Sequence, residues 1–108
     1  MKQVLLTGAT GFIGSHVAWS LVQHGYEVIA LTRPGSRMDW RHDSLKTSLG
    51  DVSDLASIRA ALVGCDAVIH AAADYKLWSK NPAVIYESNV QGTRNVLGAA
   101  IDAGVDRI

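Results

Sequence analysis

Short apolar runs alternate along the chain with segments whose apolar residues recur at helical spacing. Three of the apolar runs are typical of buried strands, and they cover residues 2–7, 26–32 and 67–73. Residues 46–50 are a weaker strand signal between the second and the last of these runs. Three segments have the helical spacing, and they cover residues 12–25, 54–63 and 82–103. A further apolar run begins at residues 105–108. The pattern therefore predicts a protein of alternating strands and helices, with residues 33–43 as an exposed loop.

Apart from residues 46–50, the predicted strands contain continuous apolar stretches rather than an apolar residue at every second position. Such strands are covered on both faces, which indicates a parallel sheet with helices on each side. Right-handed crossovers then give a doubly wound α/β sheet, and we expect a single domain over residues 1–108. Because the chain stops at Ile108 inside the fifth predicted strand, we expect an incomplete domain, the amino-terminal portion of a fold truncated in that strand.

A glycine-rich turn follows the first predicted strand. It reads GATGFIG, with Gly8, Gly11 and Gly14 at three-residue spacing, and a helical segment continues from it. In the Rossmann fold the first glycine permits the tight turn, the second lets a pyrophosphate approach the backbone, and the third lets the helix pack close to the strand. A plain turn needs one glycine rather than three in register. The pattern therefore predicts a dinucleotide site, with the phosphates at the start of the helix.

The residue after the second predicted strand bears on the choice of cofactor. NAD-binding proteins carry a carboxylate there to hold the ribose hydroxyls, but this strand ends in Arg33, and Arg37 follows. Arginine suits a 2′-phosphate, so the sequence favours NADP over NAD. Asp39 and Asp43 lie further along the loop and keep NAD open.

The third predicted strand ends in the segment GDVSD, at the edge of the sheet where ligands bind. Asp51 is expected to accept a hydrogen bond from the adenine amino group, with Val52 beside the ring; the alternative is that Asp51 is a turn residue. Asp54 is expected to cap the following helix. His70, within the fourth predicted strand, is expected to be a packed or hydrogen-bonded core histidine.

The charge balance and the cysteine count narrow the classes of function. Ten Lys and Arg residues balance ten Asp and Glu residues, which disfavours a nucleic-acid-binding protein and a polybasic membrane anchor. The single cysteine excludes an internal disulfide and a cysteine-based zinc site, and no two histidines have metal-site spacing. No apolar run reaches the roughly 18 residues of a membrane-spanning helix, and no signal-peptide layout is present. We therefore expect a cytoplasmic protein that binds small molecules, with no nucleic acid, membrane or metal partner.

Four segments in register resemble a known family. They read TGATGFIGSHV at residues 7–17, GDVSD at 50–54, AVIHAAADYKLW at 67–78 and NVQGTRNVL at 89–97. Together they resemble the extended short-chain dehydrogenases/reductases of the NAD-dependent epimerase/dehydratase family. The segment AADYKLW and the later NP are most similar to the dihydroflavonol-reductase-like branch, which includes the hopanoid-associated sugar epimerases. The resemblance covers essentially the whole chain.

The resemblance implies cofactor contacts for several groups of residues. The turn that wraps the pyrophosphate consists of Gly8, Thr10, Gly11, Phe12, Ile13 and Gly14. The end of the fourth strand runs under the cofactor ribose and consists of Ala71, Ala72 and Ala73. Asn89 either bridges the long helix to that strand and orders the nicotinamide side, or is a buried structural amide. Tyr75, Lys76 and Trp78, in the next loop, either contact substrate or cofactor or belong to the surface.

The resemblance also implies an activity, namely hydride transfer by an NADP-dependent oxidoreductase or a nucleotide-sugar epimerase/dehydratase. The substrate would be a sugar nucleotide or a hydroxy or carbonyl compound, and family members are often homodimers. The family's Tyr-x-x-x-Lys motif does not occur in these 108 residues, since Tyr26, Tyr75 and Tyr86 all lack a lysine four residues later. We therefore expect a cofactor-binding portion without catalytic residues. The alternatives are a non-catalytic dinucleotide sensor or interaction module and, disfavoured by the glycine turn, an S-adenosylmethionine-binding protein.

Overall fold

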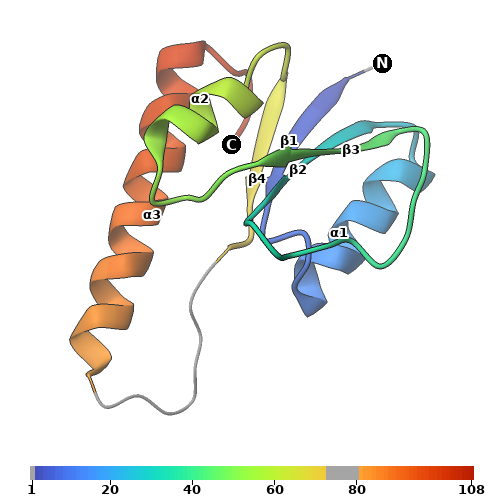
Figure 1. Cartoon of the computed structure of the whole chain (residues 1–108). Coiled ribbons are helices and arrows are strands. Elements are labelled where there is room, and N and C mark those ends of the chain that lie inside the picture. The colour runs from blue at the N-terminus through green and yellow to red at the C-terminus, as the bar shows by residue number, and fades with distance from the viewer. Residues whose placement is uncertain (1, 73–80) are drawn as a thin grey trace.

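The computed structural model describes residues 2–72 and 81–108, which form helices on both faces of a parallel sheet (Figure 1). The strands are β1 (Gln3–Thr7), β2 (Glu27–Thr32), β3 (Leu45–Leu49) and β4 (Ala67–His70). The helices are α1 (Phe12–Gln23), α2 (Leu55–Ala61) and α3 (Pro82–Ala103). In the described residues the strands pair in the order β3-β2-β1-β4, all parallel. The predicted doubly wound α/β sheet is confirmed.

The central strand β1 separates two apolar clusters, because successive side chains of a strand point to opposite faces. Leu5 faces α2 and α3, where it packs with Ile58, Val68 and Val96. Leu6 faces the other layer, where the buried residues include Ala18 and Val22 of α1 and Val28 of β2. Figure 1 shows α1 on one side of the sheet and α2 with α3 on the other. Strand β1 is therefore covered on both faces, as its continuous apolar sequence predicts.

The helix ends follow local sequence signals. Asp54 caps α2, and its Oδ1 accepts hydrogen bonds from the backbone N–H groups of Ala56 at 3.1 Å and Ser57 at 3.4 Å. Pro82 stands in the first turn of α3, where its missing N–H costs nothing. Gly104 ends α3 in the left-handed conformation that favours glycine. Among the helices of the described residues, none has the length and apolarity to cross a membrane.

The first three strands match the sequence prediction to within one residue at each end, whereas the last two differ more. The fourth strand ends at His70 rather than at residue 73, because its partner β1 ends at Thr7, the register partner of His70. The expected fifth strand is present only as one parallel bridge between Ala67 and Arg107, where the Val68 N–H donates to the Arg107 carbonyl at 2.9 Å. Ala71 and Ala72 therefore follow the strand as an irregular segment, and Ala73 lies outside the described residues.

Candidate dinucleotide site

Most of the predicted site residues lie at one edge of the sheet. Gly8, Arg33 and Ala71 directly follow β1, β2 and β4, while Asp51 comes two residues after β3. Because all the strands are parallel, their carboxyl ends meet at the same edge, and that is where ligands of such sheets bind. The fold thus gathers these four positions from segments far apart in the sequence.

The glycine turn is crowded at its first and third glycines. Gly8 has a positive φ of 76°, and a Cβ there would lie 2.6 Å from the Ala72 nitrogen and 2.7 Å from the Ala71 carbonyl carbon. A Cβ on Gly14 would collide with the carbonyl oxygen of Gly8. The turn is therefore packed against the exit of β4 on one side and against the start of α1 on the other.

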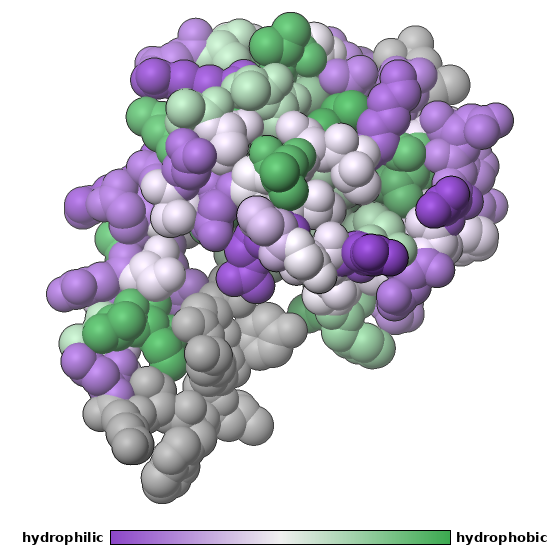
Figure 2. Space-filling view, viewed as in Figure 1, coloured by the Kyte–Doolittle hydropathy of each residue, from purple (hydrophilic) through white to green (hydrophobic). Residues whose placement is uncertain are grey.

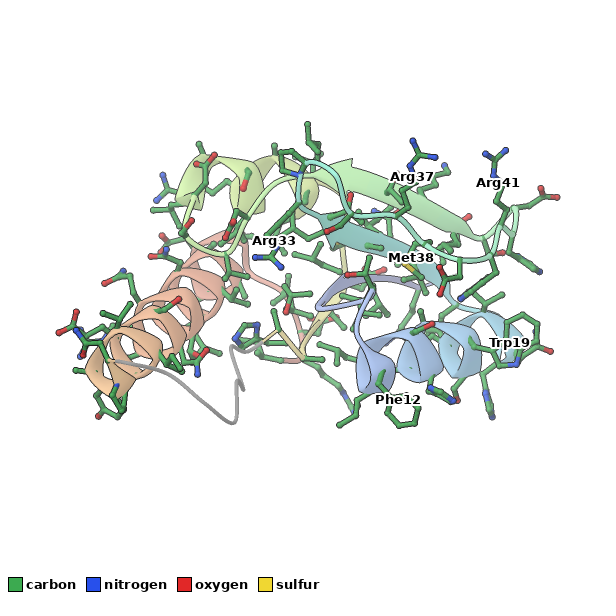
Figure 3. The ribbon with its side chains drawn as sticks, turned by 60° about the horizontal axis from the view of Figure 1, so that its bottom comes forward. Phe12, Trp19, Arg33, Arg37, Met38 and Arg41 are labelled. Atoms are coloured by element: carbon green, nitrogen blue, oxygen red, sulfur yellow. The ribbon has the colours of Figure 1, made fainter. Side chains whose placement is uncertain are left out.

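The start of α1 presents uncapped backbone N–H groups. Its N-cap is Gly11, which has no side chain to accept a hydrogen bond, and its first turn contains no acidic residue. The side chains of Phe12 and Ile13 are 78% and 71% exposed, and Figure 3 shows Phe12 extending outward from the helix start. Uncapped N–H groups and the positive end of the helix dipole suit a phosphate at this position.

Three arginines lie in or beside the loop that joins β2 to β3. Figure 3 shows the side chain of Arg33 lying apart from those of Arg37 and Arg41. Arg33, directly after β2, is the cation at the sheet edge.

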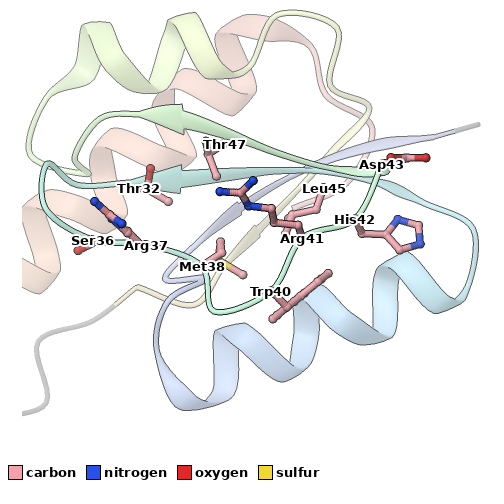
Figure 4. Close-up of a pocket in the computed structure, with 10 residues that line it drawn as sticks. All are labelled: Thr32, Ser36, Arg37, Met38, Trp40, Arg41, His42, Asp43, Leu45 and Thr47. Carbon is pink, nitrogen blue, oxygen red and sulfur yellow. The ribbon is translucent and has the colours of Figure 1, made fainter.

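The same loop covers a pocket of about 700 Å³ (Figure 4). Its lining residues come from β2, the loop and β3, and they are Thr32, Ser36, Arg37, Met38, Trp40, Arg41, His42, Asp43, Leu45 and Thr47. Trp40 also packs edge-on against Trp19 of α1, with 5.2 Å between the ring centroids. No residue of the glycine turn lines this pocket, so the pocket and the turn are separate features.

The turn after β3 is held by hydrogen bonds on two sides. The Asp51 carboxylate accepts the Ser53 N–H at 3.0 Å, which is the turn role given above as the alternative for this residue. A carboxylate has further acceptor sites, so this bond leaves room for an adenine amino group. Asn95 of α3 donates to the Val52 carbonyl at 2.8 Å. Gly92 of α3 makes room for the Val52 side chain, since a Cβ there would lie 2.9 Å from Val52 Cγ2.

The exit of β4 is tied to β1 and to α3. The Ala72 N–H donates to Thr7 Oγ1 at 3.2 Å, and Thr7 Oγ1 lies 2.6 Å from His70 Nδ1. His70 Nε2 lies 3.2 Å from Thr93 Oγ1 of α3. Burial lowers the pKa of His70 from its ordinary value of 6.5, which favours the neutral ring. His70 is thus hydrogen-bonded, as expected, but it is half-buried and lies outside both apolar clusters.

Thr93 of α3 makes a described hydrogen bond to β4, and the roles expected of Asn89 stay predictions. Asn89 lies half-buried in the first half of α3. The sequence reasoning missed Thr93 and Asn95, although both belong to the segment NVQGTRN that carries the resemblance. Tyr75, Lys76 and Trp78 lie outside the described residues. Among those that are described, no three His, Cys, Asp or Glu side chains are placed to hold a metal ion.

Curated proteins resemble this chain over nearly its whole length. The "Putative dihydroflavonol 4-reductase" of Synechocystis sp. is 40% identical over 103 residues, which cover 94% of this chain and 30% of that protein. Cinnamoyl-CoA reductase 1 of Oryza sativa subsp. japonica is 38% identical over 113 residues, which cover 97% of this chain and 32% of that protein. This chain therefore spans about a third of the length of the curated relatives that it matches.

Solved structures agree with this likeness. The crystal structure of gox2253 superposes with a TM-score of 0.87 at 41% identity, over 98% of this chain and 32% of that one. WbmH of Bordetella bronchiseptica, crystallised in complex with NAD+, gives a TM-score of 0.82 at 32% identity, over 97% of this chain and 36% of that one. The sequence profile of the NAD dependent epimerase/dehydratase family matches residues 4–108. With nearly every residue inside that match, the chain belongs to the NAD-dependent epimerase/dehydratase family, within the extended short-chain dehydrogenases/reductases.

Proposed function

We propose that this chain binds the adenosine and pyrophosphate parts of a nicotinamide dinucleotide, with NADP(H) preferred, at the carboxyl edge of its sheet. The observation that carries the proposal is the crowded turn between β1 and α1. Gly8 and Gly14 let the turn pack closely against the β4 exit and the start of α1, and the first N–H groups of that helix have no side-chain cap. The likeness to WbmH, whose structure contains NAD+, supports the same reading.

In this proposal each turn at the sheet edge has one task. The N–H groups that follow Gly11 bind the pyrophosphate. Asp51 accepts the adenine amino group beside Val52, and Arg33 pairs with the 2′-phosphate of NADP. The irregular segment of Ala71 and Ala72 runs under the ribose, where small side chains allow a flat ligand to approach the backbone. The remaining residues proposed to contact the cofactor are Gly8, Thr10, Phe12, Ile13, Gly14, Ala73 and Asn89.

Gly11→Ala tests the pyrophosphate contact. Gly11 has a φ of −78°, which alanine adopts without strain, so the variant keeps the fold while its methyl group occupies the path of the phosphate. We expect NADPH to bind at least about tenfold more weakly by calorimetry, because the methyl group displaces the phosphate and so weakens about one charge-assisted hydrogen bond to the backbone. Gly98→Ala is the matched control, because a Cβ at Gly98 meets nothing within 4 Å. Equal affinity of both variants would contradict the site.

Arg33→Ala tests the preference for NADP. An arginine that pairs with a 2′-phosphate contributes to NADPH binding but not to NADH binding. We expect the affinity for NADPH to fall by about tenfold or more while that for NADH stays unchanged. Arg59→Ala is the control, since Arg59 lies on α2 and pairs with Asp102 at 3.8 Å. An equal loss for both cofactors would argue against a 2′-phosphate contact.

For the whole protein we propose a reductase of the dihydroflavonol-reductase-like kind, or a related epimerase, acting on a hydroxy or carbonyl compound or a sugar nucleotide. The bound nicotinamide supplies or accepts the hydride. This chain contributes no catalytic residue in the proposal, and its residues bind and orient the cofactor. The two named relatives, the "Putative dihydroflavonol 4-reductase" and cinnamoyl-CoA reductase 1, support the reductase over the epimerase. The test is whether the whole protein reduces such carbonyl compounds with NADPH. A cytoplasmic location stays a prediction.

Helix α3 supports a homodimer. Its outer surface exposes Tyr86 (71%) and Ile101 (70%), with Val84 and Leu97 also exposed, and Figure 2 shows apolar surface at its N-terminal end. These apolar side chains lie along the length of α3, and a second copy of the protein would remove them from water. Ile101→Glu is expected to shift the protein to monomers in sedimentation velocity, whereas Val63→Glu, an exposed apolar position beyond α2, leaves its mass unchanged. A monomeric wild-type protein would exclude the dimer.

A further inference from the structure

A chain of side-chain hydrogen bonds runs from the end of β1 to the middle of α3. Thr7 Oγ1 lies 2.6 Å from His70 Nδ1, and His70 Nε2 lies 3.2 Å from Thr93 Oγ1. The backbone N–H of Ala72 donates to the same Thr7 oxygen at 3.2 Å. The bonds of the His70 ring therefore join β4, which carries it, to β1 and α3, and Thr7 extends the chain of bonds to Ala72.

The bond from Ala72 sets the direction of the other protons. Thr7 Oγ1 accepts from the Ala72 N–H and has one hydrogen of its own to donate. Among the described residues, the acceptor within reach of that hydrogen is His70 Nδ1. An unprotonated Nδ1 leaves the proton of the neutral ring on Nε2, which then donates to Thr93 Oγ1. Burial of His70 favours this neutral form, because it lowers the pKa of the ring.

The same chain of bonds holds the two backbone segments that form the proposed site. Thr7 and His70 are register partners in neighbouring strands, and Gly8 follows Thr7 directly. The Ala71–Ala72 peptide lies so close to Gly8 that no Cβ fits between them. A change in the position of the His70 ring therefore moves both sides of this contact.

We propose that His70 and Thr93 are positioning residues for dinucleotide binding. His70, with its proton on Nε2, joins Thr7 to Thr93 and so fixes the glycine turn against the exit of β4. Both residues act through the backbone of Gly8 and Ala72. This inference rests on the proposed function of the edge as a dinucleotide site.

A purely structural core histidine makes a different prediction from a positioning residue. Packing alone requires the shape of the ring and of the Thr93 side chain, whereas the proposed role requires the Thr93 hydroxyl as an acceptor. Thr93→Val keeps the shape and removes the hydroxyl, and Thr93→Ser keeps the hydroxyl. His70→Asn is a second variant, because its amide reaches the position of Nδ1 but not that of Nε2.

The first experiment needs no cofactor. In the free protein, nitrogen NMR of the His70 ring is expected to show a protonated Nε2 and an unprotonated Nδ1. Hydrogen exchange at the Ala72 amide is expected to speed up about fivefold in Thr93→Val, the factor of one weakened hydrogen bond, and to stay unchanged in Thr93→Ser. A proton on Nδ1, or unchanged Ala72 exchange in Thr93→Val, would overturn the proposal.

The second experiment measures NADPH dissociation constants of the folded variants by calorimetry. Thr93→Val and His70→Asn are each expected to weaken binding about fivefold, and the double variant no further, because the two residues act as one unit. Thr93→Ser and Thr47→Val, a matched removal of a hydroxyl on β3, are expected to bind as the wild type does. Unchanged affinity in both single variants, or additive losses, would overturn the proposal. A wild-type protein that binds no dinucleotide would instead refute the proposed function, while the exchange experiment still decides whether His70 fixes the turn.

Discussion

Two glycines with the same backbone conformation have different surroundings. Gly8 and Gly25 have φ values of 76° and 85°, in the left-handed region that side chains rarely adopt. A Cβ on Gly25 meets nothing within 4 Å, whereas one on Gly8 overlaps the Ala71–Ala72 peptide. Gly25 therefore serves only the backbone conformation, while Gly8 also permits a close approach between two chain segments.

This difference predicts different costs for the two alanine variants. Gly25→Ala is expected to lower the free energy of unfolding by about 1–2 kcal/mol, the cost of a left-handed side-chain residue. Gly8→Ala adds the cost of overpacking and is expected to lose about 1–3 kcal/mol more. Urea unfolding of both variants measures the difference between their free energies of unfolding. Equal losses would mean that the β4 exit moves away from Gly8 without cost.

Asn95 shows how one side chain on α3 holds a distant turn. It donates to the Val52 carbonyl at 2.8 Å in a partly buried position, and its own carbonyl accepts from Gln91 at 2.9 Å on the surface. Asn95→Ala is expected to destabilise the protein by about 1–2 kcal/mol, because the Val52 carbonyl loses its donor. The exposed Gln91→Ala control is expected to cost only about 0.2–0.5 kcal/mol. Thermal unfolding that ranks the two variants equally would contradict this assignment.

At the scale of elements, the lengths of strands and helices depend on partners as well as on sequence. The sequence predicts the three helices and four strands of the described residues in order. Apolar patterns mark all of them except β3, whose sequence LKTSL is largely polar. The sequence pattern extends β4 to residue 73, since three alanines continue the apolar run. The ladder instead ends at His70, where the Thr7 side chain takes the Ala72 N–H. No period within one segment encodes that contact, which joins residues 65 positions apart.

The candidate site divides in the same way. The glycine turn, the residue after β2 and the turn after β3 follow from local motifs, so the sequence predicts where they lie. The bonds from Thr93 and Asn95 arise only when α3 packs across the sheet edge, so the sequence cannot predict them from spacing. Asp51 lies between these cases, because its bond to the Ser53 N–H is local and compatible with either role.

The short helix α2 depends on its N-cap. Seven residues are too few for a stable isolated helix, and the Asp54 carboxylate satisfies two of its first N–H groups. Asp54→Ala is expected to cost about 1 kcal/mol of unfolding free energy, and Asp54→Asn, which keeps a capping oxygen, only a few tenths. Urea unfolding compares the two. If Asp54→Asn were as unstable as Asp54→Ala, the charge of Asp54 rather than its hydrogen bonds would be what stabilises α2.

At the scale of the whole molecule, β1 joins the two apolar layers. Its side chains contribute to both clusters, and its last residue, Thr7, is fully buried between the glycine turn and His70. Loosening this end of β1 therefore affects both layers of helices. The His70 ring, which bonds Thr7, links the stability of the whole fold to pH.

The sign of that dependence follows from the direction of the pKa shift. Burial lowers the pKa of His70 in the folded protein, whereas the unfolded chain has the ordinary value of 6.5. Above that value the ring is neutral in both states, and its hydrogen bonds stabilise the fold in full. As the pH falls below it, the unfolded chain takes up the proton first, so the free energy of unfolding decreases until the pH reaches the lowered pKa. The measurement compares the free energy of unfolding of the wild type with that of His70→Asn, in urea unfolding between about pH 5 and 8. The wild type is expected to be the more stable protein by the largest margin above pH 6.5, and that margin is expected to shrink as the pH falls below this value. Carboxylates titrate alike in both proteins, so they cancel in the difference between the two unfolding free energies. A difference that stays constant or widens toward acid pH would contradict a half-buried neutral ring.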